Sequence, residues 1–215
     1  MVDSYRHKGM RKRLIDSIRK KGITDEKILD AMNSIPRHLF LDSSFLEYAY
    51  DDKPFPIGSG QTISQPYTVA FQTDILDVQK GHKVLEIGSG SGYQACVLEE
   101  LGAKVFSIER QKKLYLKTKE FIDGLGYSIK FFYGDGNKGA PSFAPFDRIL
   151  ITAAAPEISE ELFSQLKIGG KLVVPLGEGD VQTMIRLTKT SENDFSEEQF
   201  GAFRFVPLLK NKAND

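Results

Sequence analysis

The stretch "VLEIGSGSGYQACVLEEL", residues 84–101, places an apolar run before three glycines on alternate positions and a helical pattern after them. Glycines allow a tight turn and let a ligand approach the main-chain N–H groups that open a helix. The stretch therefore predicts a strand, a ligand-binding turn at Gly88, Gly90 and Gly92, and a helix. Tyr93 stands where the dinucleotide fingerprint G-x-G-x-x-G has its third glycine, so an NAD dehydrogenase is a distant alternative.

Around this stretch, short β-branched runs alternate with longer helical runs, which is typical of a mostly parallel sheet flanked by helices. Helices are expected near 93–101, 111–125 and 157–167, between the strands "KVLEI" (83–87), "KVFSI" (104–108), "KFFY" (130–133), "DRILIT" (147–152) and "KLVVPLG" (171–177). Next, "TMIRLTKT" (183–190) and "FRFVPLL" (203–209) favour an antiparallel hairpin, and "KNKAND" (210–215) is expected to be disordered. The sequence predicts a doubly wound α/β fold of Rossmann-like type with N-terminal helices and a C-terminal antiparallel edge.

Two helices are expected before the sheet. In residues 1–21, Leu14, Ile15 and Ile18 fall at helical spacing, which predicts an amphipathic helix with a solvated basic face made of Arg6, Lys8, Arg11, Lys12, Arg13, Arg19, Lys20 and Lys21. An arm that contacts RNA is less favoured, because no aromatic residues interleave these charges. The run "TDEKILDAMNSIPR" predicts a second helix that Thr24 caps and Pro36 ends.

Composition narrows the class of protein. The chain has 215 residues with 29 Lys+Arg and 29 Asp+Glu, so no overall charge favours nucleic acid. A single cysteine, Cys96, excludes an internal disulfide, and no apolar run approaches the roughly 20 residues that span a bilayer. We expect a cytoplasmic monomer with no nucleic-acid or membrane partner. It would be one domain over 1–215, with helices and an active-site loop in 1–80, the cofactor-binding sheet in 81–190, and an edge strand and tail in 191–215.

The strand ends suggest which cofactor binds. Glu109 ends the strand "FSIER", where a carboxylate can accept both ribose hydroxyls, and Asp135 lies in "GDG" at the next strand end, where it could accept from an adenine amino group. Each feature alone is also a common turn or cap. Together with the G-x-G-x-G spacing, they favour S-adenosylmethionine, which has a ribose and an adenine but no phosphate.

The sequence indicates the methyl acceptor less directly than it indicates the cofactor. The run "TAAAP" (152–156) lacks the tetrad typical of enzymes that methylate base nitrogens, and surface or capping roles are expected for His7, His38 and His82. A carboxylate acceptor needs no base, because its pKa is about 4. In "GSGQTISQPYTVAFQ" (58–72), Pro66 fits the first turn of a helix, so Ser64 and Gln65 would lie near an N-terminus that can bind an anion. The alternative is that Ser64 only caps this helix.

The chain resembles the protein-L-isoaspartate (D-aspartate) O-methyltransferase family. The resemblance runs from "PRHLF" (36–40) to "FVPL" (205–208), through "AYDDKPFPIGSGQTISQP", "VLEIGSGSGYQA", "IER", "GDG", "PFDRILITAAAP" and "QLKIGGKLVVPLG". It implies a repair enzyme that methylates the α-carboxylate of L-isoaspartyl residues, with D-aspartyl residues as a further candidate substrate. The ester would then collapse to a succinimide, whose hydrolysis returns some aspartate.

The resemblance also implies a set of site residues. Ser64 would be catalytic, and Ile57, Gly58, Ser64 and Val206 would bind the substrate peptide. S-adenosyl-L-methionine, leaving as S-adenosyl-L-homocysteine, would bind at Thr62, Glu86, Gly88, Ser89, Gly90, Gly92, Glu109, Arg110, Asp135 and Gly136, and no metal is expected. Two alternatives stay open: a methyltransferase acting on RNA or a small molecule, and a non-catalytic module that binds the cofactor.

Overall fold

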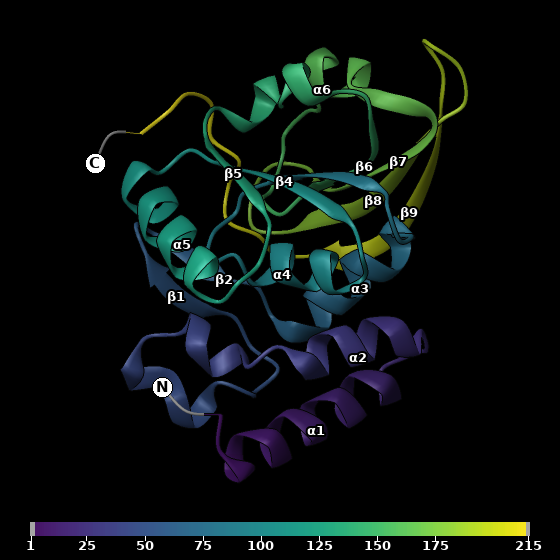
Figure 1. Ribbon diagram of the computed structural model, residues 1–215. Coiled ribbons are helices and arrows are strands. Elements are labelled where there is room, and N and C mark those ends of the chain that lie inside the picture. The colour runs from purple at the N-terminus through teal and green to yellow at the C-terminus, as the bar shows by residue number, and fades with distance from the viewer. Residues whose placement is uncertain (1–2, 214–215) are drawn as a thin grey trace.

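A seven-stranded sheet forms the centre of the computed structural model, which describes residues 3–213 (Figure 1). The strand order is β5-β4-β3-β6-β7-β8-β9. In chain order the strands are β3 (Lys83–Ile87), β4 (Lys104–Glu109), β5 (Lys130–Tyr133), β6 (Phe146–Ile151), β7 (Leu166–Leu176), β8 (Gln182–Lys189) and β9 (Phe195–Phe203). Strands β3 to β7 pair in parallel, whereas β8 pairs antiparallel with both β7 and β9. The prediction of a mostly parallel sheet with an antiparallel edge is confirmed.

The strand order reverses beside β3. The chain runs outward from β3 through β4 to β5 and then returns to β6 on the other side of β3. In open α/β sheets the ligand crevice lies at the carboxyl ends of the strands at such a reversal. Gly88 directly follows β3, Glu109 ends β4, and Thr152 follows β6, so the fold gathers these residues at one end of the sheet.

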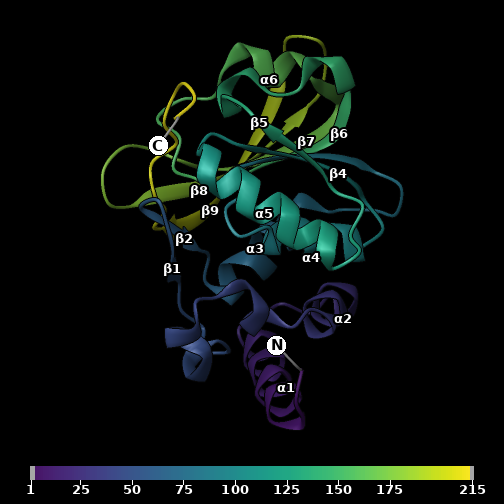
Figure 2. The same ribbon diagram turned by 60° about the vertical axis from the view of Figure 1, so that its left-hand side comes forward.

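Helices cover both faces of the sheet. The helices are α1 (Tyr5–Lys20), α2 (Glu26–Ser34), α3 (Pro66–Leu76), α4 (Tyr93–Glu100), α5 (Lys112–Gly124) and α6 (Glu160–Ser164), with 3₁₀ turns η1 (Arg37–Phe40), η2 (Ser43–Tyr48), η3 (Gly136–Lys138) and η4 (Pro141–Phe143). Helices α3, α4 and α5 lie on one face and α6 on the other (Figure 2). Helices α1 and α2 form a further layer that packs against α3 and α4, and the hairpin of β1 (Phe55–Gly58) and β2 (Gln61–Ile63) precedes α3. No helix in residues 3–213 is long and apolar enough to cross a bilayer.

Strand β3 shows why the sheet is buried on both faces. Its side chains alternate between the faces: Val84 packs into the core shared with α1 to α4, and Leu85 and Ile87 pack into a second core with Leu162 of α6. A strand that is covered on both sides reads as a continuous apolar run rather than an alternating one. This is why residues 83–87 were recognisable as a strand.

The N-terminal layer differs from the prediction in two details. Helix α2 is capped by Asp25, whose side chain accepts from Lys27 N–H, and not by Thr24. Arg11 is buried rather than solvated, because its guanidinium donates to the Asn33 carbonyl and to Asp3. The two helices and the amphipathic pattern are otherwise confirmed.

The C-terminal part differs more. The hairpin is confirmed, but its second strand is β9 (Phe195–Phe203), so the strand prediction for 203–209 is wrong. Val206 and Leu208 instead pair with Ala154 through Ala154 N–H to the Val206 carbonyl and Leu208 N–H to the Ala154 carbonyl. The helix predicted over 157–167 is limited to α6, because β7 begins at Leu166.

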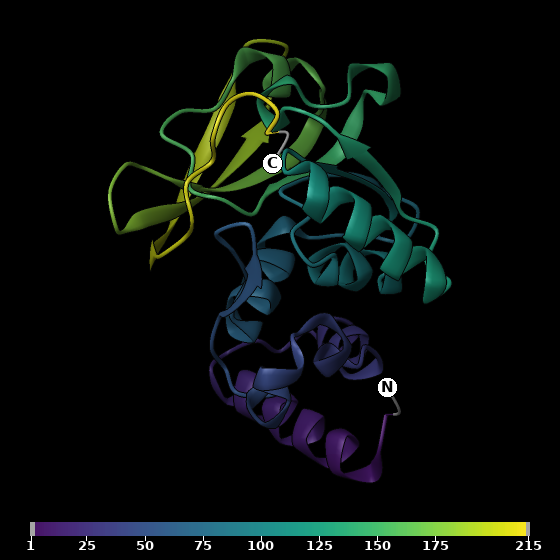
Figure 3. The same cartoon turned by 90° about the vertical axis from the view of Figure 1, so that its left-hand side faces the viewer.

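The prediction of disorder for 210–215 is wrong for residues 210–213, and 214–215 lie outside the described residues. Ala213 N–H donates to the Arg110 carbonyl and Asn211 N–H donates to Asp135. This segment, drawn in yellow in Figure 3, runs back along the sheet toward α5. The tail is therefore fixed at the carboxyl ends of β4 and β5.

Candidate active site

The glycine loop after β3 is held in place by hydrogen bonds to its neighbours. Gly88 N–H and Ser89 N–H both donate to the Ile108 carbonyl, at 2.9 and 3.2 Å. Gly90 N–H donates to Glu109 Oε2 at 3.0 Å, and the Gly90 carbonyl accepts from Thr118 Oγ1 at 2.7 Å. The loop is therefore positioned by β4 and α5 before any ligand arrives.

Gly88 and Gly92 must be glycine on two grounds. Both have positive φ, +97° and +82°, which side chains with a Cβ rarely adopt. A Cβ on Gly88 would lie 2.6 Å from Thr152 Oγ1, and one on Gly92 would lie 2.9 Å from Ile122. Thr152 has little freedom to move, because its hydroxyl lies 2.9 and 2.7 Å from the Ile87 and Gly88 carbonyls.

Glu86 lies beneath the loop and not at its surface. Its side chain is fully buried, accepts from the Ser107 hydroxyl, and connects through Ser107 to Ser89 Oγ. The other carboxyl oxygen, Oε1, has no hydrogen-bond partner among the described residues. Burial raises the pKa of Glu86 to about 8, so this carboxyl is largely protonated at neutral pH. Glu86 can support the loop through the two serines.

The two predicted carboxylates at the strand ends are both hydrogen-bonded. Glu109 is 5% exposed and accepts from Gly90 N–H and Gln111 N–H, and burial raises its pKa. Asp135 accepts from Asn137 N–H on one oxygen and from Asn211 N–H on the other. Although burial opposes this, these donors hold the pKa of Asp135 below its usual value. A carboxylate has about four acceptor positions, so each retains capacity for a ligand.

A crevice lies over the glycine loop. Of the predicted residues, it is lined by Thr62, Ser64, Gly88, Ser89, Gly90, Glu109, Arg110, Gly136 and Val206. The remaining predicted residues lie elsewhere: Glu86 and Gly92 behind the loop, Asp135 beside the tail, and Ile57 and Gly58 in a depression next to α5. Nine of the predicted site residues thus line the same crevice.

A wider groove adjoins this crevice, with a volume of about 910 Å³ against about 70 Å³ for the crevice. Thr62, Ser64, Thr152 and Val206 line both spaces, so these four residues mark their junction. The groove is walled by aromatic side chains from α3 and the β9 region, Tyr67, Phe71, Phe200, Phe203 and Phe205. Among the described residues that line the groove, Arg204 is the one with a charged side chain. Its positive charge favours an anionic ligand.

Ser64 is not a helix cap. Helix α3 begins at Pro66 with Gln65 as its N-cap and has no side-chain cap, and no described residue forms a hydrogen bond with Ser64 Oγ. The N–H of Tyr67 in the first turn donates to Asp52 Oδ1 at 2.7 Å. Asp52 therefore already places a carboxylate at this N-terminus, whereas the Ser64 hydroxyl at the junction is available to another group.

Arg37 holds the main chain at Ser64. Its side chain is fully buried, Nη2 donates to the Ser64 carbonyl at 2.9 Å, and the guanidinium lies 5.0 Å from the ring centre of Tyr93. Nε and Nη1 have no hydrogen-bond partner among the described residues. Burial lowers the pKa of Arg37 to about 10, so it remains charged at neutral pH. A positive charge is therefore fixed directly behind the junction.

Two residues at the junction, Arg37 and Thr152, were not predicted from the sequence. Arg37 lies in "PRHLF", far from the glycine loop, and nothing local indicates that it contacts Ser64. Thr152 did carry a signal, because it ends the run "DRILIT" at a carboxyl strand end, where ligand contacts are expected.

Comparisons with known proteins show the family of the chain. The family model for Protein-L-isoaspartate(D-aspartate) O-methyltransferase (PCMT) matches residues 9–213. The protein-L-isoaspartate O-methyltransferase of Christiangramia forsetii is 59% identical over 213 residues, which cover 99% of this chain and 100% of that protein. The enzyme of the same name from Flavobacterium johnsoniae is 56% identical, again over 99% and 100%.

Solved structures give the same picture. A protein-L-isoaspartate O-methyltransferase superposes with a TM-score of 0.85 at 32% identity and covers 95% of this chain and 67% of its own. A beta-aspartate methyltransferase (PCMT) from Plasmodium falciparum, in complex with S-adenosyl-L-homocysteine, has a TM-score of 0.82 at 26% identity over 94% of this chain and 99% of its own. The chain belongs to the protein-L-isoaspartate (D-aspartate) O-methyltransferase family.

Proposed function

We propose that this chain repairs damaged proteins by transferring the methyl group of S-adenosyl-L-methionine to the α-carboxylate of L-isoaspartyl residues. The observation that carries the proposal is the junction of crevice and groove at Thr62, Ser64, Thr152 and Val206. Methyl transfer is an in-line displacement, so donor and acceptor must meet at one such point. No histidine or lysine lines either space among the described residues, which suits an acceptor that is already ionised.

The crevice fits S-adenosyl-L-methionine in its chemistry. The cofactor supplies a methyl group on a positively charged sulfur when it is bound. We assign its methionine part to the loop of Gly88, Ser89 and Gly90, with Gly92 and Glu86 supporting that loop from behind. Glu109 has acceptor positions left for ribose hydroxyls. Asp135 and Gly136 would contact the adenine, with Thr62 and Arg110 along the rim. The crevice measures about 70 Å³ and joins the groove at Ser64 and Val206.

The groove fits a peptide with a free carboxylate. The Ser64 hydroxyl can donate a hydrogen bond to that carboxylate, and the charges of Arg37 behind the junction and Arg204 on the wall favour the anion. No described residue accepts from Val206 N–H, so this group is available to the substrate backbone. Donor and acceptor charges cancel toward the transition state, so the apolar walls favour the reaction by excluding water.

Ile57 and Gly58 are proposed to contact the peptide outside the groove. Both lie on the β1–β2 hairpin and line the depression next to α5, and the Ile57 side chain lies above Gly90. We further propose that residues 1–80, 81–190 and 191–215 act as one domain and that the enzyme is a cytoplasmic monomer without a nucleic-acid or membrane partner. Size-exclusion chromatography with light scattering tests the oligomeric state.

A pair of peptides that differ only in isoaspartate versus aspartate tests the activity. The purified chain is incubated with methyl-labelled S-adenosyl-L-methionine, and base-labile label is measured on each peptide. Label on the isoaspartyl peptide alone is the expected result, and the same experiment with a D-aspartyl peptide defines the range of substrates. Cofactor binding without label on any of the peptides would contradict the proposal and bring RNA or a small molecule forward as the acceptor.

A further inference from the structure

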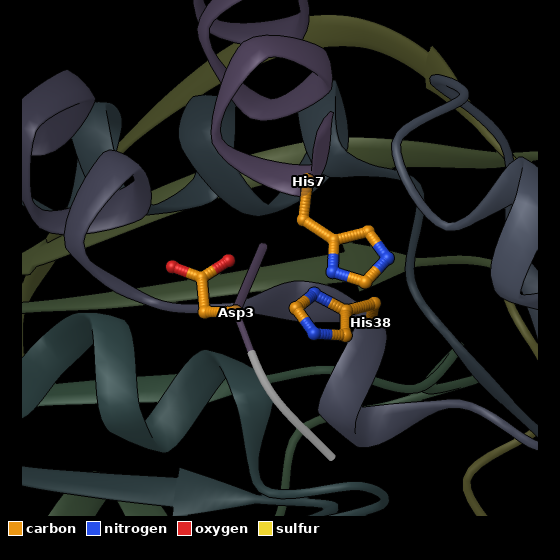
Figure 4. A group of neighbouring side chains, drawn as sticks. All are labelled: Asp3, His7 and His38. Carbon is orange, nitrogen blue, oxygen red and sulfur yellow. The ribbon is translucent and has the colours of Figure 1, made fainter. Parts of the chain in front are cut away.

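Two histidines and an aspartate meet in the N-terminal layer, apart from the methyl-transfer site (Figure 4). Asp3, His7 and His38 each offer one ligand atom, and these atoms all lie within 4.8 Å of one another. The rings of His7 and His38 face each other, with centroids 3.8 Å apart and planes tilted by 31°. Surface or capping roles were predicted for both histidines, and this prediction is wrong for His38, which is fully buried.

Two nitrogens in this cluster lack a partner. His7 Nδ1 and His38 Nε2 are buried and have no hydrogen-bond partner among the described residues. Unpaired buried polar atoms are rare in folded proteins and call for an explanation. A neutral imidazole can present a lone pair to a ligand.

The surroundings orient that lone pair. His38 Nδ1 lies 2.7 Å from the Tyr50 hydroxyl, which also accepts from Arg11 Nη1 at 3.1 Å. In the tautomer in which His38 Nδ1–H donates to this oxygen, Nε2 carries no proton and can present its lone pair to a ligand. Asp3 accepts from Arg11 Nη1 and Nη2 at 3.2 and 3.0 Å and still has acceptor positions. Metal-bound histidines commonly donate their other N–H in this way.

We propose that Asp3, His7 and His38 form a binding site for a divalent metal ion of the Zn²⁺ type. Two imidazole nitrogens and a carboxylate oxygen are typical Zn²⁺ ligands, and three protein ligands leave a position for water. Ligand atoms of a tetrahedral Zn²⁺ lie about 3.3–3.6 Å apart, so the side chains must draw together, and the facing imidazole rings must turn until both lone pairs point at the ion. The ion would join the start of α1 to η1, next to Arg37, without entering the crevice.

Metal titration tests the site without relying on activity. The chain is stripped with a chelator and titrated with Co²⁺, whose visible absorption reports tetrahedral coordination, and with Zn²⁺ in calorimetry and thermal melting. We expect one ion per chain and a Zn²⁺-dependent rise in melting temperature. His7→Gln and Asp3→Asn should each weaken binding at least tenfold; both side chains are only half-buried, so these variants should still fold.

The matched control is His82→Gln. His82 lies in the turn before β3, where its Nδ1 accepts from Gln79 N–H, so this change should leave metal affinity unaltered. The proposal is overturned if the parent chain binds Co²⁺ and Zn²⁺ no better than His7→Gln does. It is equally overturned if His82→Gln loses as much affinity as His7→Gln, or if the Co²⁺ spectrum shows thiolate ligation, since Cys96 is the only thiol.

Discussion

The cofactor crevice and the acceptor groove meet at Ser64, yet different kinds of contact hold them. In the crevice, the loop carbonyls and N–H groups bond to the adjacent strand and helix, as Gly90 does to Glu109 and Thr118. At the acceptor side, the Ser64 carbonyl depends on one buried arginine 27 residues earlier, and the far wall comes from β9 and the segment after it. One half is a local supersecondary unit, and the other is assembled from three distant parts of the chain.

This difference predicts different sensitivity to mutation. The crevice is rigid because its glycines fit between packed side chains, so small additions there should abolish binding. The groove has more space and unpaired donors, so changes there should alter rates while the fold survives. Four substitutions test this contrast.

Gly88→Ala should have the largest effect. The new Cβ would lie 2.6 Å from Thr152 Oγ1 at a φ of +97°, which forces the loop to move. We expect S-adenosyl-L-methionine affinity, measured by calorimetry, to fall about a hundredfold or more, which is about 2.7 kcal/mol. Gly126→Ala is the matched control, because its φ is +86° but no atom lies within 4 Å of the new Cβ. Equal losses of affinity in both variants would mean that the loop does not bind the cofactor.

Ser64→Ala should reduce turnover ten- to a hundredfold with little change in melting temperature. The reason is that Ser64 Oγ makes no hydrogen bond with the described residues and lies at the junction, so only the bound carboxylate loses a donor. Ser159→Ala is the control, because Ser159 caps α6 through Leu162 N–H. It should cost about 1 kcal/mol of stability and leave kcat intact. Intact turnover in Ser64→Ala would remove Ser64 from the mechanism.

The same contrast explains what the sequence could predict. Strand β3, the glycine turn and α4 are contiguous, and glycine, periodicity and strand ends are local signals, so the fold class and the crevice residues were accessible. Strand β9 could not be predicted in this way, because "FSEEQFGAF" is polar on both faces at the exposed edge of the sheet and has no alternation of apolar and polar residues. The apolar run beyond it was mistaken for that strand.

The acceptor side needed contacts that no local pattern encodes. Asp52, and not Ser64, supplies the carboxylate at the N-terminus of α3, and it lies 15 residues before the N–H that it accepts from. Arg37 was not identified, and His7 and His38 were assigned surface or capping roles, since burial depends on how α1 packs on the rest of the chain. The family resemblance supplied the function that this half could not reveal locally.

Arg37→Met should raise the KM for the isoaspartyl peptide about tenfold and leave the Kd for S-adenosyl-L-methionine unchanged. The substitution removes the charge behind the junction and the donor to the Ser64 carbonyl, and Arg37 itself does not line the crevice. Arg37→Lys keeps a positive charge and should restore part of the KM. A purely structural role would instead make both variants unstable and equally inactive, which chemical denaturation alongside the kinetics would reveal.

Glu86→Gln should have the smallest effect on activity, and it should appear as a pH dependence of stability. Burial raises the pKa of Glu86 from 4.5 to about 8, so between these values the folded chain holds a proton that the unfolded chain has lost. The parent protein therefore loses stability as pH rises through this window, by up to about 1.4 kcal/mol per pH unit from this group. Glutamine can still accept from Ser107 but does not titrate. In urea unfolding at pH 5.5 and 7.5, the free energy of unfolding of the variant relative to the parent should therefore be more favourable at pH 7.5. If the difference in free energy of unfolding between variant and parent is the same at both pH values, Glu86 is ionised beneath the loop. The contrast between a rigid crevice and a tolerant groove would then rest on the glycines alone.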